Sequence, residues 1–185
     1  EGMIWNEGDT ISSPSFDIMR RVAILCNTAE LKHNGDKVIE IGDPLETGLL
    51  KFAEDSGESI VEIRQKYLKV NEEPFSSETK MMATMHRSGN ELVAYAKGAV
   101  EELVKRSTHI LFDDTLKAFD ETLKQHWLNE AEKFASSGLR IIAGAYKKCT
   151  DAHEKEFGSG LTFVGLFGMM DPPRKEVFKA LEDCR

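Results

Sequence analysis

The sequence predicts an α+β fold in which helices flank a central antiparallel β-sheet. Before Pro74, apolar residues recur at helical spacing. After it the period changes, and the runs 80–87 and 91–97 flank a Gly-containing turn that is typical of a β-hairpin. The remaining helices and strands do not alternate in the regular βαβ order that builds a parallel sheet. We therefore expect an antiparallel sheet.

The helices in the first part of the chain are predicted from their starting residues. Ser13 and Pro14 supply an N-cap and a proline in the first helical turn, so a helix is expected over about 14–27. The run 43–46 repeats this signal with the D-x-x-E spacing of a capping box, in which the glutamate turns back to the helix start. A third helix is expected over 60–67.

The second part of the chain combines helices with apolar strands. A short helix is expected over 100–106, and a longer one over about 120–136 that ends at Gly138, a common helix stop. The apolar stretches 139–146 and 161–169 are expected to be buried central strands.

A domain boundary is expected at Asp171-Pro172-Pro173, because an X-Pro-Pro sequence is stiff and extended. We predict one domain over 1–170, and a hinge with the start of a further helix over 171–185.

Composition argues against several classes of function. A net charge of -8 disfavours nucleic-acid binding, which needs a basic face. No apolar run approaches the ~18–20 residues that cross a bilayer, and no signal-peptide pattern begins the sequence. The three cysteines are far apart, as is typical of reduced cytosolic thiols, and the histidines show no metal-ligand spacing. A small anionic ligand remains compatible, because a few gathered cations can outweigh a distant acidic surface.

Six segments, in order and at compatible separations, resemble the nucleotide-binding domain of P-type cation-transporting ATPases. They are Leu25-Cys26-Asn27 with Ala29, Gly42-Asp43-Pro44-Leu45-Glu46, Phe75-Ser76-Ser77-Glu78-Thr79-Lys80-Met81-Met82, Lys97-Gly98-Ala99 with Glu101, Gly138-Leu139-Arg140, and Asp171-Pro172-Pro173-Arg174. The resemblance covers about 16–185. The run 75–82 is closer to calcium-pump-like members than to the heavy-metal branch.

The resemblance implies an ATP-binding cytoplasmic domain of an integral membrane protein that couples ATP hydrolysis to cation transport. In this family a phospho-aspartate forms in the DKTGT motif of another domain. The sequence contains no DKTGT, TGD or GDGxND motif, so we expect no catalytic residue here and ATP binding without turnover. Mg²⁺ is expected to act mainly through the phosphorylation domain. The implied partners are ATP or ADP, the phosphorylation and actuator domains of the same parent chain, and the membrane through helices outside this sequence.

The resemblance also assigns ATP-binding residues, which are Glu46, Phe75, Lys80, Met82, Lys97, Gly98, Ala99 and Arg140. Phe75 matches the phenylalanine that stacks on adenine, a contact that contributes roughly 1–3 kcal/mol per base. From residue type alone, a core position is favoured for Phe75. Glu46 matches the glutamate that accepts a hydrogen bond from the adenine amino group, and its alternative is the capping box.

Lys80 and Lys97 match two lysines near the phosphates and the back of the nucleotide site. A lone lysine is usually a solvated surface group, but Lys97 ends an apolar strand and precedes Gly98, so it can reach a phosphate as a point charge. Gly98 and Ala99 would line the floor of the site, where larger side chains would collide with the purine.

The remaining matches are to a supporting wall and to groups around the phosphates. Arg140 matches an arginine that reaches the ribose or phosphates, and its alternative is to cap the sheet edge. Met82 would add an apolar wall. Arg174, in the hinge, could orient the nucleotide, and a purely structural hinge is the alternative.

Two positions depart from the family: Leu45 stands where many relatives carry threonine, and Ser77 where some carry a phosphate-binding arginine. The second departure should weaken the grip on phosphate without affecting adenine.

Two other classes of function remain as alternatives. One is a nucleotide-blind interaction or regulatory domain with the same fold, supported by the departures at Leu45 and Ser77. The other is a stand-alone soluble enzyme, which is disfavoured because the sequence has no P-loop, no GxGxxG and no nucleophile–base motif.

Overall fold

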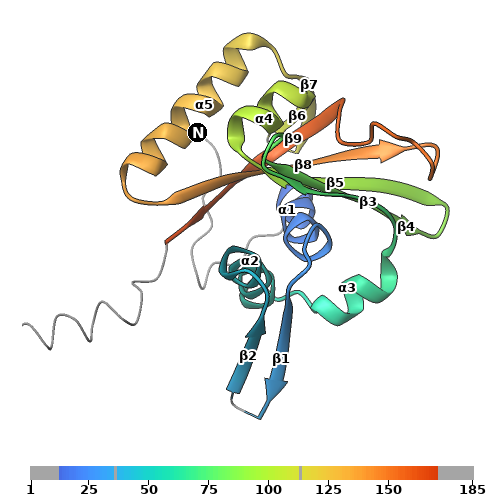
Figure 1. The fold of residues 1–185 in the computed structure, drawn as a ribbon. Coiled ribbons are helices and arrows are strands. Elements are labelled where there is room, and N and C mark those ends of the chain that lie inside the picture. Colours follow the sequence, from blue (N-terminus) through green and yellow to red (C-terminus); the bar gives the residue numbers. More distant parts are fainter. Residues whose placement is uncertain (1–12, 36, 113, 171–185) are drawn as a thin grey trace, which may run out of the picture.

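A sheet between two groups of helices forms the three layers of the structure, a computed structural model that describes residues 13–35, 37–112 and 114–170 (Figure 1). On one side of the sheet lie α1 (Pro14–Leu25), α2 (Pro44–Asp55) and α3 (Ile60–Lys66). On the other side lie α4 (Val100–Arg106) and α5 (Glu121–Ser136). The α+β prediction is confirmed, as are the helices predicted within the described residues, with ends that differ by at most two residues.

The central sheet has seven strands in the order β3-β4-β5-β8-β9-β6-β7. These strands are β3 (Leu68–Ser76), β4 (Met81–Ser88), β5 (Glu91–Gly98), β6 (Ser107–Phe112), β7 (Thr115–Ala118), β8 (Arg140–Cys149) and β9 (Leu161–Met169). Neighbouring strands are antiparallel except β6 and β9, which are parallel. The two predicted central strands are β8 and β9, in the middle of the sheet. A separate antiparallel pair, β1 (Glu30–Asn34) and β2 (Lys37–Ile41), projects away from the helices in Figure 1.

The start of α2 corrects one detail of the sequence analysis. Asp43 caps this helix, but its Oδ1 accepts a hydrogen bond from the backbone N of Leu45, one residue earlier than in a capping box. The Glu46 carboxylate accepts hydrogen bonds from Thr28 and Lys97. The capping-box alternative is therefore wrong, and the Glu46 side chain is available for another role.

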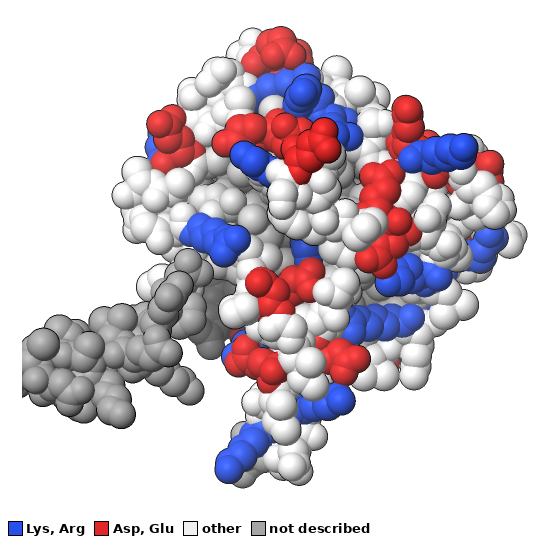
Figure 2. Space-filling view, in the orientation of Figure 1, with Lys and Arg blue, Asp and Glu red and all other residues white. Residues whose placement is uncertain are grey.

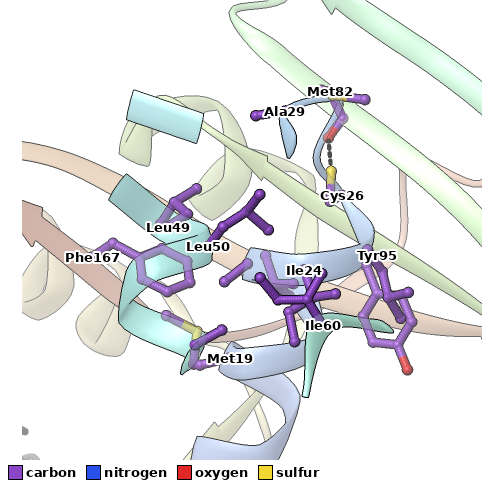
Figure 3. Close-up of a cluster of buried hydrophobic side chains, with 14 of the residues drawn as sticks. Met19, Ile24, Cys26, Ala29, Leu49, Leu50, Ile60, Met82, Tyr95 and Phe167 are labelled. Atoms are coloured by element: carbon purple, nitrogen blue, oxygen red, sulfur yellow. Dashed lines mark hydrogen bonds between the residues drawn. The ribbon is translucent and has the colours of Figure 1, made fainter. Parts of the chain in front are cut away.

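Packing of α1 on the sheet depends on two glycines. Gly144 and Gly165 face each other on β8 and β9, and a Cβ at Gly144 would lie 2.8 Å from the Met19 sulfur. Without those side chains, Met19 of α1 rests directly on the sheet and joins the apolar cluster that includes Leu49 and Phe167 (Figure 3). Such close packing fixes α1, and with it the segment that follows its C-terminus.

Several strands were not predicted, because they lack a buried face. Every described residue of β2 is exposed, and β3, at the edge of the sheet, has no fully buried residue. The β6–β7 hairpin was missed for a different reason, since Ile110 and Leu111 of β6 are buried but the two strands are only six and four residues long. The expected hinge, 171–185, lies outside the described residues. Within the described ranges, no helix has both the length and the apolar character needed to span a membrane.

Candidate functional site

The strand register brings the predicted residues to one end of the sheet. Ser76 pairs with Met81, Met81 with Gly98, and Gly98 with Ala143, so the ends of β3 and β5 lie beside the starts of β4 and β8. Arg140 occupies the first position of β8. Predicted residues from all four strands therefore share this end of the sheet, although they are far apart in the sequence.

Glu46 and Lys97 form an ion pair that joins the first turn of α2 to the end of β5. The Lys97 Nζ lies 2.6 Å from Glu46 Oε1, and the two side chains are only 7% and 13% exposed, respectively. Removing one partner of a buried pair leaves an uncompensated charge, so the two groups depend on each other. The ammonium group that we expected near a phosphate is here bonded to the carboxylate that we expected at the adenine.

The second oxygen of the Glu46 carboxylate is held by Thr28. Glu46 Oε2 accepts hydrogen bonds from the Thr28 backbone N at 3.1 Å and from its Oγ1 at 2.5 Å. Burial opposes ionisation of Glu46, but the hydrogen bonds from Lys97 and Thr28 outweigh it and hold the pKa of this carboxyl below its usual range. Glu46 is therefore an ionised, oriented acceptor.

Phe75 is exposed near the end of the edge strand β3. Its exposed fraction is 64%, so most of the residue's surface is open to solvent. The core alternative for Phe75 is wrong. An open aromatic ring at a sheet edge is a surface on which a planar base can stack.

Lys80 lies in the tight turn between β3 and β4. Its φ is +49°, in the left-handed region that costs a lysine about 1–2 kcal/mol. The turn is held by two backbone hydrogen bonds, from Lys80 N to Ser76 O at 2.7 Å and from Ala99 N to Lys80 O at 2.9 Å. A Cβ at Gly98 would lie 2.5 Å from Lys80 O. We expected a purine to approach Gly98 closely, but in the structure it is the backbone of this turn that does so. The Lys80 side chain is exposed.

Met82 belongs to the core on the α1 side of the sheet. It is 4% exposed and lies opposite Lys97 in the register, so it packs on the same face as the Lys97 side chain. Its carbonyl oxygen accepts a hydrogen bond from the Cys26 thiol at 3.4 Å (Figure 3). Burial raises the pKa of Cys26 to about 11, so this thiol is protonated at neutral pH.

The positive charge at the candidate site comes from a few individual side chains and not from a broad basic surface. Figure 2 shows acidic and basic side chains interspersed over the described face of the molecule. Arg140 and Lys80 are both exposed at the shared end of the sheet. Attraction of an anion to this end therefore depends on these individual cations.

Two open cavities lie elsewhere. One, of about 370 Å³, is lined by β1, the end of α2 and α3, and the other, of about 410 Å³, by β7, β8 and β9. None of the predicted ATP-binding residues lines either cavity. Neither cavity is lined by an exposed Phe, Tyr or Trp ring, so the sheet end, which has one in Phe75, remains the candidate site. In the part of the chain that the structure describes, no three His, Cys, Asp or Glu side chains are grouped so that they could hold a metal ion.

Comparison with known proteins identifies the family of the chain. A family model described as P-type ATPase, cytoplasmic domain N matches residues 15–176. The chain belongs to this family. Similar proteins include the sodium/potassium-transporting ATPase subunit alpha-A of Artemia franciscana, 37% identical over 94% of this chain and 19% of that protein. They also include the cation-transporting ATPase pma1 of Synechocystis, 35% identical over 87% of this chain and 18% of that protein. The calcium-transporting ATPase lmo0841 of Listeria monocytogenes is 28% identical over 98% of this chain and 20% of that protein. This domain N thus spans about a fifth of the length of these relatives.

Two residues that follow α1, Asn27 and Thr28, also contact the candidate site and were not assigned from the sequence. Asn27 appeared only as part of a motif, and Thr28 was not considered. Asn27 Nδ2 donates to the Glu46 carbonyl oxygen at 2.9 Å, and Thr28 holds the Glu46 carboxylate. The available signal was their position at the end of a predicted helix, in a segment that already matched the family.

Proposed function

We propose that this chain binds ATP at the end of the sheet formed by β3, β4, β5 and β8. The observation that carries the proposal is that an exposed aromatic ring, Phe75, shares this end with a partly buried, ionised acceptor, Glu46. A purine needs both features, a flat apolar surface for its ring and a fixed polar group for its edge.

The proposed roles follow from exposure and charge. Adenine stacks on Phe75, and its amino group donates to Glu46, whose charge is maintained by Lys97. The exposed cations Lys80 and Arg140 are free to turn toward the phosphates, which suits point charges on long side chains. Met82, Gly98 and Ala99 support the site through the core and the β3–β4 turn rather than through polar contacts with the ligand.

We further propose that the parent protein is an ATP-driven cation pump, of which this chain is a cytoplasmic domain. The relatives above are named for calcium, for sodium and potassium, and for cations in general. The run 75–82 favours a calcium-pump-like member over the heavy-metal branch. In such a pump the covalent step takes place on an aspartate of another domain. The described residues contain no cluster of His, Cys, Asp or Glu side chains that could hold Mg²⁺, so we assign no Mg²⁺ ligand among them.

The test is an NMR titration of the chain with ATP, ADP and GTP. We expect a dissociation constant for ATP of about 0.1 to several mM, or roughly -4 to -5 kcal/mol, because the domain that would hold the γ-phosphate is not part of this chain. ADP should bind within about threefold of ATP, and GTP more weakly, because guanine presents a carbonyl to Glu46. An absence of shifts at Phe75, Lys97 and Gly98 with about 10 mM ATP would show that the domain is nucleotide-blind.

A further inference from the structure

The two oxygens of the Glu46 carboxylate are not equivalent. Oε2 accepts two hydrogen bonds, both from Thr28, whereas Oε1 accepts one, from Lys97. An ionised carboxylate offers about four lone-pair positions, two on each oxygen. Oε2 is therefore saturated, and the position that remains for a ligand is on Oε1, beside the Lys97 ammonium.

Thr28 is itself held in place by the residues around it. The neighbouring Asn27 donates from Nδ2 to Ala23 O and to Glu46 O, both at 2.9 Å, and its Oδ1 accepts from Ala29 N at 2.8 Å. These bonds tie the end of α1 to the first turn of α2. The Thr28 backbone N and hydroxyl therefore approach Glu46 from a fixed direction.

We propose that Thr28 is the positioning residue through which the site distinguishes adenine from guanine. This inference rests on the proposed ATP site. With Thr28 on Oε2, the carboxylate cannot turn, and Oε1 accepts a hydrogen bond only from a donor such as the 6-amino group of adenine. Guanine presents a carbonyl oxygen at that position, and two facing acceptors repel each other. Thr28 touches no ligand atom in this scheme and acts only through Glu46.

The test compares Thr28→Val with Thr28→Ser in the same chain. Valine keeps the branched shape and the backbone N–H but removes the hydroxyl, whereas serine keeps the hydroxyl. We expect Thr28→Val to weaken ATP binding by about three- to tenfold, the effect of one hydrogen bond, and to leave GTP binding unchanged. The ratio of ATP to GTP affinity should fall accordingly. Thr28→Ser should retain the ratio of the original chain.

A purely structural role for Thr28 gives a different result. Loosening of the α1–α2 connection would weaken ATP and GTP binding together and leave their ratio unchanged, and this outcome would overturn the proposal. A second readout is the pKa of the Glu46 carboxyl, followed by carbon-13 NMR, which should rise in Thr28→Val because one of the groups that lowers it is lost. If the original chain binds no ATP, the proposed function fails as well. If the original chain binds ATP but Thr28→Val has the same ratio of ATP to GTP affinity, only the positioning role of Thr28 fails. Thr28→Ala repeats the test if the valine variant does not fold.

Discussion

Replacement of Phe75 by alanine should abolish most nucleotide binding and leave the fold intact. A phenylalanine buries roughly 150–250 Å² when it is enclosed. Phe75 is 64% exposed, so only about a third of that surface is covered here. At roughly 25 cal/mol per Å², the 50–90 Å² involved correspond to about 1–2 kcal/mol of folding stability at most. Loss of the stacking surface should reduce binding by roughly 1–3 kcal/mol, a large part of what a millimolar site has.

The assay needs both quantities from one variant and a matched control. Urea unfolding gives the change in stability, and an ATP titration followed by NMR gives the change in affinity. Phe163→Ala is the control, because Phe163 is 0% exposed and its truncation should cost about 3–5 kcal/mol. If Phe75→Ala lost as much stability as Phe163→Ala, or bound ATP as well as the original chain, the assignment of Phe75 as a base platform would be refuted.

Three further perturbations test the surroundings of the site. Lys97→Met should destabilise the fold by about 1–3 kcal/mol in urea unfolding, because the partly buried Glu46 carboxylate keeps its charge without its partner, and adding Glu46→Gln should restore part of the loss. If the variant that carries both Lys97→Met and Glu46→Gln is as unstable as Lys97→Met alone, the loss does not come from the Glu46–Lys97 ion pair. Burial lowers the pKa of His86 below 6.5, so the unfolded chain takes up a proton at higher pH than the folded one. Its contribution to stability should therefore be complete above about pH 7 and decline as the pH falls below about 6.5, and His86→Gln should flatten this part of a stability–pH curve. Gly98→Ala should destabilise by about 1–3 kcal/mol, because its Cβ would meet the Lys80 carbonyl, whereas Gly48→Ala, in a helix with room for a methyl group, should stabilise by about 0.5–1 kcal/mol. Equal thermal melting points for the two glycine variants would contradict this explanation.

The sequence predicted the elements whose residues carry a clear local signal. The helix that begins after Asp43 is predicted by its capping residue, and the strands β8 and β9 are predicted by their continuous apolar runs. The hairpin β1–β2 and the edge strand β3 were missed, because the alternation of apolar and polar residues, as at Ile39/Ile41 and Leu68/Val70, is confined to very short runs.

Prediction of the site shows the same division. The family motifs gave the residue types at the sheet end, but they could not show which of them touch each other. That Lys97 bonds to Glu46, and that Gly98 makes room for the Lys80 turn, depends on the packing of segments about twenty to fifty residues apart. The contribution of Thr28 is equally invisible from the sequence, because a threonine after a helix has many ordinary uses.

The order of the strands dictates when the sheet can be completed as the chain leaves the ribosome. The β6–β7 hairpin is joined to the other strands only through β9. Because β6 begins at Ser107 and β9 ends at Met169, about 60 residues must still be translated after β6 first appears. At roughly 5–20 residues per second, β6 waits about 3–12 s with one edge paired to β7 and the other edge, which pairs with β9 in the finished sheet, still open. During this interval Ile110 lacks its β9 neighbour Phe163, so the open edge of β6 can pair incorrectly with another chain until β9 emerges.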